Sequence, residues 1–378
     1  MKVEQRIVVG MLDGLGWEYW EATELPHLRR MAEEGFCKEV EAIFPSVTNV
    51  NNVSICTGAW PCQHGIIGNS YYDPEQAGAV YMNAATLISH PTLFQRAARD
   101  GKKSALLTSK RKTIELLCLD TELAIAAECP SDEWIERLGQ PANIYSREIN
   151  YWLWKAAILL LQERPDLSII YVHTTDYPMH TWAPEAVESI EHLQQLDRLI
   201  AEAQTVAPDA AFFLTADHGM NPKTRAWDLT KVLELAGTPI RFALSPERDY
   251  YIQHHRNLAG CSYLWLRRAE DQQSVCHALS QIEGVQEVLT RQQAIERFHL
   301  PDHRVGDLVV LADQTSMFGD LDQPFELLPP TYRNHGSLYE MRVPLIIGNY
   351  HGRRPDDGFF THNRDLTRFL FPDSATKA

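Results

Sequence analysis

Three strongly apolar runs of this chain each end at or near an aspartate, and this recurrence is the feature that most restricts the fold. Residues 7–12 precede Asp13, residues 168–172 come shortly before Asp176, and residues 211–216 precede Asp217 and His218. Short apolar runs rich in β-branched and aromatic residues are typical of strands buried on both faces, as in parallel sheets. We therefore expect parallel strands that carry acidic side chains to their carboxyl ends, where α/β sheets place chemistry.

Helix-like segments alternate with the apolar runs, which predicts a mostly parallel central sheet with helices on both faces. We expect strands at 7–12, 104–108, 168–172, 211–215 and 307–311, and helices at 25–34, 93–100, 149–162 and 184–204. Between about residues 241 and 300 the segments become shorter, with strand-like runs at 262–266 and 285–289 and a helix-like run at 271–282. We therefore expect an α/β core formed by residues 1–240 and 301–378, with a small α+β cap insertion at 241–300.

The side chains that follow the strands are those that bind borderline metal ions. Aspartate oxygen and histidine nitrogen suit Zn²⁺, and Mn²⁺ or Fe²⁺ can use the same donors. Any one of these residues alone reads as an ordinary turn aspartate or a buried histidine. Their joint occurrence predicts a two-metal site, with six candidate ligands: Asp13, Asp176, His180, Asp217, His218 and His335.

A stretch between the first two aspartates carries a second set of motifs. It contains P-x-x-T-x-x-N from Pro45, T-G-x-x-P-x-x-H-G-I from Thr57, and Asn69 shortly after. With the strand-end Asp13, the later D-x-x-x-H and D-H-G, and the late H-G at His335, the order resembles the alkaline phosphatase superfamily. The chain is most similar to its nucleotide pyrophosphatase/phosphodiesterase branch and, within that, to the phosphonoacetate hydrolases.

The resemblance implies a role for each motif residue. Thr48 matches the nucleophile, at a helix N-terminus that favours an incoming phosphoryl group; Ser46 is the rival hydroxyl. One metal would bind Asp13, Asp217, His218 and the Thr48 oxygen, and the second would bind Asp176, His180 and His335. Asn69 matches the donor to the phosphoryl oxygens, although a turn residue is the simpler reading of Gly68-Asn69.

Lys110 and Lys112 match the paired lysines that, in phosphonoacetate hydrolases, contact the substrate carboxylate and phosphonate. Cations at that position stabilise a leaving carbon whose charge spreads into a carboxylate. The same lysines also fit a solvated basic face with Lys102, Lys103 and Arg111. The leading hypothesis is a di-zinc hydrolase that cleaves phosphonoacetate to acetate and phosphate through a phosphothreonine.

Two alternatives remain open. A nucleotide pyrophosphatase or phosphodiesterase should carry an aromatic residue for base stacking just after the nucleophile, where this chain has Asn49. A metal-binding protein without turnover would have no use for Thr48. Tyr71, Tyr72, Tyr250 and His254 are candidates for the roof of the site, although packing is the simpler role for each aromatic ring.

Composition bears on partners and location. The chain has 378 residues, 44% of them hydrophobic, and a net charge of -15, which argues against a nucleic-acid polymer as partner. We expect a small-molecule phosphonate or phosphate ester as substrate and no membrane partner, and the oligomeric state stays open. Seven cysteines without a paired framework and no signal-like segment near Met1 favour a cytoplasmic protein.

Overall fold

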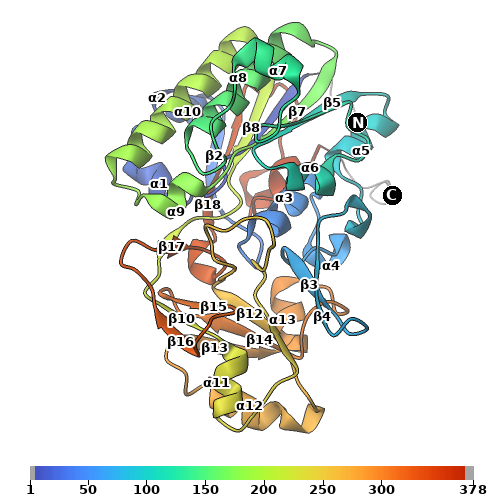
Figure 1. The fold of residues 1–378 in the computed structure, drawn as a ribbon. Coiled ribbons are helices and arrows are strands. Elements are labelled where there is room, and N and C mark those ends of the chain that lie inside the picture. The colour runs from blue at the N-terminus through green and yellow to red at the C-terminus, as the bar shows by residue number, and fades with distance from the viewer. Residues whose placement is uncertain (1–4, 371–378) are drawn as a thin grey trace.

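The computed structural model describes residues 5–370, which form two packed parts (Figure 1). The larger part is built on a seven-stranded sheet of order β2-β18-β8-β1-β7-β5-β6. Five of its strands, β1 (Ile7–Met11), β5 (Lys103–Thr108), β6 (Leu123–Ala126), β7 (Leu167–His173) and β8 (Ala211–Thr215), form a parallel block. Strand β18 (Arg342–Gly348) runs antiparallel between β8 and β2 (Phe36–Glu41). The mostly parallel sheet expected from the sequence is confirmed.

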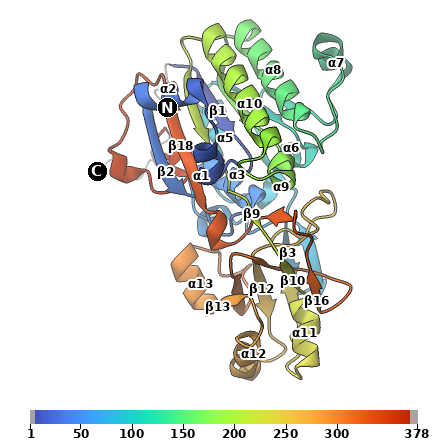
Figure 2. The same cartoon turned by 90° about the vertical axis from the view of Figure 1, so that its left-hand side faces the viewer.

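Helices cover both faces of this sheet (Figure 2). One layer consists of α2 (Pro26–Glu34), α8 (Glu148–Glu163) and α10 (Val187–Val206), which pack against one another and against β7 and β18. The other layer contains α3 (Thr48–Thr57), α5 (Leu93–Arg99) and α14 (Asp365–Arg368). All five residues of β1 and of β8 are buried, which explains why these strands read as uninterrupted apolar runs.

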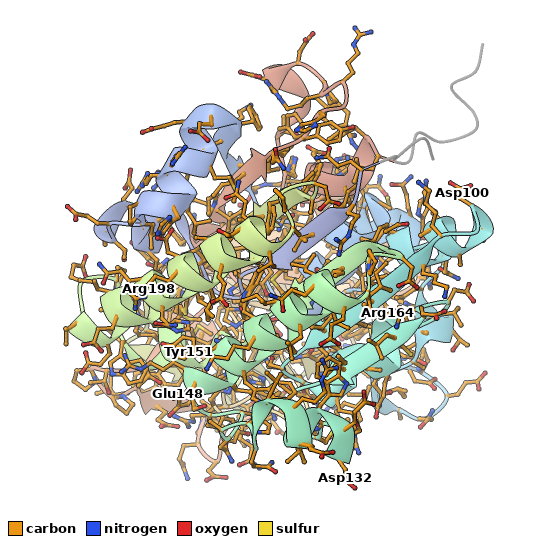
Figure 3. All side chains as sticks on the ribbon, turned by 90° about the horizontal axis from the view of Figure 1, so that it is seen from above. Asp100, Asp132, Glu148, Tyr151, Arg164 and Arg198 are labelled. Carbon is orange, nitrogen blue, oxygen red and sulfur yellow. The ribbon has the colours of Figure 1, made fainter. Side chains whose placement is uncertain are left out.

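The outer faces of the helices carry the charge. Figure 3 shows Glu148 on α8 and Arg198 on α10 among the side chains on the helical layer, and both are exposed. The opposite face of α8 buries Leu153, Ala157 and Leu160. This amphipathic division is the reason these helices could be predicted from sequence to within about three residues. Within residues 5–370, no helix is both long and apolar enough to cross a bilayer.

The smaller part contains a four-stranded sheet of order β11-β12-β14-β13 and a three-stranded sheet of order β15-β10-β16. The first comprises β11 (Phe242–Leu244), β12 (Cys261–Trp265), β13 (Val285–Thr290) and β14 (Leu308–Ala312), with α11 (Leu229–Leu235), α12 (Gln272–Leu279) and α13 (Arg291–Phe298) beside it. The second comprises β10 (Arg225–Trp227), β15 (Ser316–Phe318) and β16 (Phe325–Leu327). Several of these elements lie outside 241–300, the range expected for the insertion.

One expected core strand has a different place. The strand predicted at 307–311 is β14, and it pairs with β12 and β13 instead of joining the central sheet. Its residues alternate between two hydrophobic cores: Val309 and Leu311 pack into the main core, whereas Leu308 and Val310 face a second core with α11 and α12. The four-stranded sheet is therefore a wall shared by both parts of the molecule.

Two further strand pairs lie outside these sheets, and the other helices include α1 (Trp17–Ala22), α4 (Pro61–His64), α6 (Arg111–Leu117) and α7 (Asp132–Leu138). Strand β3 (Ser70–Asp73) pairs with β4 (Gly78–Tyr81), and β9 (Asn221–Pro222) pairs with β17 (Arg333–Asn334). The short helix α9 (Tyr177–Thr181) follows β7. The β9–β17 pair is important for the site because it carries His335 close to the end of β8.

Candidate two-metal active site

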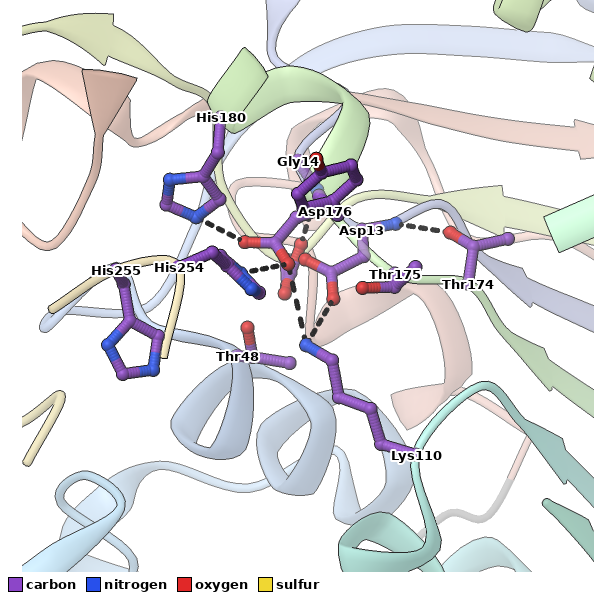
Figure 4. Close-up of polar contacts among 12 residues, drawn as sticks. Asp13, Gly14, Thr48, Lys110, Thr174, Thr175, Asp176, His180, His254 and His255 are labelled. Carbon is purple, nitrogen blue, oxygen red and sulfur yellow. Dashed lines mark hydrogen bonds and ion pairs between the residues drawn. The ribbon is translucent and has the colours of Figure 1, made fainter. Parts of the chain in front are cut away.

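The carboxyl ends of three adjacent strands bring the candidate ligands together. Strands β7, β1 and β8 are neighbours in that order, and Asp176, Asp13 and Asp217 follow them. Backbone contacts fix the loops: the amide of Asp13 donates to Oγ1 of Thr174 at 2.9 Å, and the amide of Gly14 donates to Oδ1 of Asp217 at 3.0 Å (Figure 4). All three carboxylates are buried.

The first cluster consists of Asp13, Asp217 and His218. Nε2 of His218 lies 3.3 Å from Oδ2 of Asp217, 3.6 Å from Oδ1 of Asp13 and 3.3 Å from Oγ1 of Thr48. Two ligands held about 2.0 Å from a tetrahedral ion are about 3.3 Å apart. Oxygens of Asp13 and Asp217 and a nitrogen of His218 all lie within 4.8 Å of one another, so these three groups could hold such an ion, with the Thr48 hydroxyl beside His218.

The second cluster is built around Asp176. Its Oδ2 lies 2.8 Å from Nε2 of His180 and 3.6 Å from Nε2 of His335. The spacing of Asp176 and His180 results from α9, which begins directly after Asp176 and returns His180 to the same side. The His335 ring also stacks on the His218 ring with centroids 3.6 Å apart, so His335 stands between the two clusters.

Main-chain carbonyls orient three of the histidines. Nδ1 of His180 faces the carbonyl of Arg333 at 2.8 Å, Nδ1 of His218 faces that of Gly219 at 2.9 Å, and Nδ1 of His335 faces that of Ser46 at 2.9 Å. A carbonyl only accepts, so each Nδ1 carries the proton and each Nε2 keeps a lone pair. Histidines that ligate metals are held in this way by a group behind the ring.

Two carboxylate oxygens of the first cluster have no hydrogen-bond partner among the described residues. In the described part of the chain, Oδ1 of Asp13 and Oδ2 of Asp217 are buried and have no hydrogen-bond partner, and both face Nε2 of His218. Burial, together with the nearby Asp176 and Asp217, raises the pKa of Asp13 well above its usual value. Burying several carboxylates side by side is costly unless cations accompany them. The donor set therefore fits a pair of divalent metal ions.

The residue predicted as the nucleophile lies beside the first cluster. Thr48 is the first residue of α3 and is half-buried, with its hydroxyl toward His218. The rival hydroxyl of Ser46 is fully buried and donates to the carbonyl of Ser337 at 2.7 Å. Thr48 is therefore the hydroxyl of this pair that faces the metal ligands.

The lysine pair is buried in the site instead of forming a solvated face. Nζ of Lys110 lies 3.4 Å from Oδ1 of Asp176 and 3.6 Å from Oδ2 of Asp13 (Figure 4). Burial alone would lower the pKa of Lys110, but these two aspartates raise it above the usual value. Nζ of Lys112 donates to Oδ1 of Asn69 at 3.0 Å and also to Oδ2 of Asp249.

Asn69 belongs to a network that joins the two parts of the molecule. Its Nδ2 donates to Oε2 of Glu247 at 2.9 Å, and Nε2 of His255 lies 3.4 Å from the same oxygen. Burial raises the pKa of Glu247 to about 8. A cavity of about 20 Å³ lies among Thr48, Asn69, Lys110, Lys112, Glu247 and their neighbours, which is room for about one water molecule. The smaller part therefore contributes side chains to the cavity beside Thr48.

The comparisons agree with this geometry. The family model for type I phosphodiesterase / nucleotide pyrophosphatase matches residues 7–337. The chain belongs to this family. A solved relative, the phosphonoacetate hydrolase of Sinorhizobium meliloti 1021 in complex with phosphonoacetate, is 30% identical, with a TM-score of 0.86 over 96% of this chain and 94% of that chain. The alkaline phosphatase PafA, 14% identical with a TM-score of 0.68 over 96% of this chain and 94% of that one, shares the fold.

Sequence relatives within the family are phosphodiesterases. The venom phosphodiesterase of Naja atra is 26% identical over 229 residues, which are 57% of this chain and 26% of that protein. The chain thus matches about a quarter of that relative's length. What the match shows is membership of this family, and the His and Asp clusters of the described chain are groups that could hold metal ions.

Sequence reasoning missed three polar residues of the site. Glu247, Asp249 and His255 come from the irregular loop between β11 and β12, where no periodic pattern marks a functional position. Of the four residues considered for the roof, His254 lies at the metal ligands, and burial lowers its pKa to about 4. The three tyrosines pack elsewhere: Tyr72 against Phe242 and Trp265, Tyr250 against Tyr81, and Tyr71 beneath Arg304.

Proposed function

We propose that this family member is a di-zinc hydrolase that cleaves the carbon–phosphorus bond of phosphonoacetate, releasing acetate and phosphate through a phosphothreonine on Thr48. The observation that carries the proposal is the burial of Lys110 and Lys112 in the pocket of Thr48. Two cations there are what a substrate with a phosphonate and a carboxylate requires. The 30% identity with the S. meliloti phosphonoacetate hydrolase over nearly the whole chain supports the same substrate class.

The residues available for metal binding fit the reaction. Asp13, Asp217, His218 and Thr48 would hold one Zn²⁺, and Asp176, His180 and His335 would hold the other. Bound zinc would act as a Lewis acid on the phosphoryl oxygens and lower the pKa of the nucleophile. Mn²⁺ or Fe²⁺ suit the same donors, so the donor set does not select zinc alone.

The chain's own residues perform the remaining steps. Oγ1 of Thr48 attacks phosphorus in line and loses its proton to solvent, while the bond between phosphorus and carbon breaks. The electron pair of that bond moves to the departing carbon and spreads into the adjacent carboxylate, whose charge Lys110 and Lys112 stabilise. The Nδ2 of Asn69 donates to a phosphoryl oxygen. The carbon takes a proton from solvent to give acetate.

A water molecule then resolves the phosphothreonine. It attacks phosphorus from the side vacated by acetate, the bond from phosphorus to Oγ1 breaks, and Thr48 recovers a proton as phosphate leaves. Two inversions at phosphorus give net retention. Thr48 is the first residue of α3, so the free backbone amides at that end of the helix would lie next to the phosphoryl group in both steps.

A second candidate is hydrolysis of a phosphate diester. Asp249 is paired with Lys112, and this pairing offsets one of the two positive charges that a carboxylated phosphonate would meet. The family's phosphodiesterases also favour it. The residue after the nucleophile argues against a nucleotide, because Asn49 presents a buried amide nitrogen with no partner among residues 5–370 instead of an aromatic face.

The test compares two substrates on one preparation. The zinc-loaded protein is incubated with phosphonoacetate and, in parallel, with a p-nitrophenyl nucleotide diester, and release of phosphate and of nitrophenolate is measured. We expect phosphate release from phosphonoacetate to be much faster, and Thr48→Ala to abolish it while both metals stay bound. Rapid nitrophenolate release without phosphate from phosphonoacetate would replace this proposal with the diesterase.

A further inference from the structure

His254 comes from the smaller part of the molecule but lies at the second metal cluster. It belongs to the loop between β11 and β12, and its side chain is 8% exposed. Its Nε2 lies 3.3 Å from Oδ1 of Asp176, and its ring centroid is 4.5 Å from that of His180 (Figure 4). One carboxylate of the core therefore has histidines from both parts of the molecule around it.

The ring of His254 contacts the carboxylate of Asp176 but makes no hydrogen bond within the described chain. Considering the described residues 5–370, neither Nδ1 nor Nε2 of His254 has a hydrogen bond of acceptable geometry. The rings of Tyr145 and Tyr177 lie edge-on to it at 5.8 and 5.9 Å, so its surroundings offer mainly carbon on those sides. Burying a polar group without a hydrogen bond costs about 1–3 kcal/mol of stability. The position therefore implies a further group that binds a ring nitrogen of His254.

We infer that His254 is a protein ligand of the metal held by Asp176 and His180. A nitrogen of His254, an oxygen of Asp176 and a nitrogen of His180 all lie within 4.8 Å of one another. The 3.3 Å from Nε2 to Oδ1 matches the separation of about 3.3 Å between two ligands of a tetrahedral ion. The inference rests on the two-metal site of the proposed function and adds to it a ligand from the smaller part of the molecule.

This ligand differs from the other three histidines in what holds it. His180, His218 and His335 are each fixed by a main-chain carbonyl behind the ring, whereas Nδ1 of His254 has no such partner in the described chain. Such an orienting group strengthens a metal ligand. His254 is thus the ligand that is most easily released.

Release of His254 from the metal would accompany an outward movement of the smaller part's loop between β11 and β12. Asp176, His180, His335 and His254 together fill four positions, which is closed coordination for zinc. The loop that carries His254 also lines the small cavity beside Thr48 through Glu247, Asp249, Ile252 and His255, so outward movement of this loop would enlarge the cavity for a substrate. That movement frees a coordination position at the moment when the substrate arrives.

The experiment measures metal binding without substrate. His254→Gln retains an amide that can donate to Asp176 but provides a poor metal ligand, and His255→Gln is the matched control because His255 faces Glu247. Competition with a chelator gives the affinity of each site, X-ray absorption counts the imidazoles around zinc, and hydrogen exchange follows the amides of residues 249–257 with and without metal.

In His254→Gln we expect one of the two affinities to fall by at least about tenfold, the lower end of what a group behind a ligand contributes. The imidazole count should fall by one, and the metal-dependent protection of residues 249–257 should disappear. His255→Gln should match the wild type in all three measurements.

Two results would overturn the inference, and they have different meanings. If the wild type binds two zinc ions and His254→Gln has the same affinities, imidazole count and exchange, His254 is only a neighbour of Asp176 and the proposed function stands. If the wild type binds no metal, the proposed function fails, and the inference fails with it.

Discussion

Replacing Lys223 with methionine should destabilise the protein strongly and in a pH-dependent manner. The side chains of Lys223 and Glu340 are both 0% exposed, and Nζ of Lys223 donates to Oε1 of Glu340 at 2.8 Å. Glu340 also accepts from Asn221 and, at Oε2, from the amide and hydroxyl of Ser337. The carboxylate thus ties the segment after β8 to the one that carries His335.

The magnitude follows from the burial of the pair. Removing one partner of a buried ion pair costs about 3–5 kcal/mol because the remaining charge is uncompensated. Three hydrogen bonds to Glu340 persist in Lys223→Met, so we expect a loss near the lower end, about 3 kcal/mol at pH 7. Lys223→Met/Glu340→Gln removes the charge as well and should recover most of that loss.

The pH dependence has a defined sign. Burial would raise the pKa of Glu340, but Lys223 and the hydrogen bonds hold it below the usual value. The wild type therefore gains stability from this group above the unfolded pKa of about 4.3 and loses it as pH falls through the lower folded pKa. Without Lys223 the buried carboxyl tolerates protonation, so the deficit of Lys223→Met should shrink as pH falls toward 4.

Equilibrium urea unfolding followed by tryptophan fluorescence, at several pH values and in excess chelator, measures these free energies. The chelator removes the contribution of metal binding from the comparison. A deficit below about 1 kcal/mol at pH 7, or one that grows as pH falls, would refute the reasoning, because either result means that Glu340 does not bear a buried charge.

Three further predictions concern the site. Removing metal by chelation should lower the unfolding temperature in calorimetry and re-addition of Zn²⁺ should restore it, since a metal at 100 times its Kd adds about 2.7 kcal/mol; equal unfolding temperatures would exclude tight binding. Lys112→Met should lower kcat/KM for phosphonoacetate by about 10²–10³ with zinc stoichiometry unchanged, and unaltered kinetics would return Lys112 to a structural role. Gly260→Ala would place a Cβ 2.4 Å from that of Ser337, two residues from His335, and should weaken one metal site in chelator competition, whereas Gly358→Ala, which meets nothing within 4 Å in the described chain, should not.

The central strands and helices were predictable because burial and amphipathicity mark them in the sequence. Strands β1, β5, β7 and β8 and helices α2, α5, α8 and α10 begin and end within about three residues of expectation. Strand β18 was not predicted, because Pro344 argues against a strand within a sheet. Pro344 has no amide hydrogen to donate, but its carbonyl accepts a hydrogen bond from Oγ1 of Thr215, and the residue pairs with Glu39 of β2. Strand β2 alternates buried and exposed residues irregularly, which conceals it.

The candidate site residues that the sequence indicates are those that follow strands, and those it does not indicate come from a loop. Asp13, Asp176 and Asp217 were identified because each follows an apolar run directly or within a few residues, and all three are buried in the clusters described above. Glu247 and Asp249 lie on a segment without periodicity, so their approach to Asn69 and Lys112 depends on how the two parts pack. Local sequence contains no record of that packing.

The use of main-chain carbonyls to orient His180, His218 and His335 has a consequence for how such a protein changes over time. A main-chain carbonyl stays in place when the side chain of its residue is replaced. Each ring therefore keeps its proton on Nδ1 as long as the fold is retained. Variation in the residues around the ligands leaves their lone pairs in place. New substrate preferences can therefore arise in the loop of Glu247, Asp249 and His255 while the chemistry of the ligands stays constant.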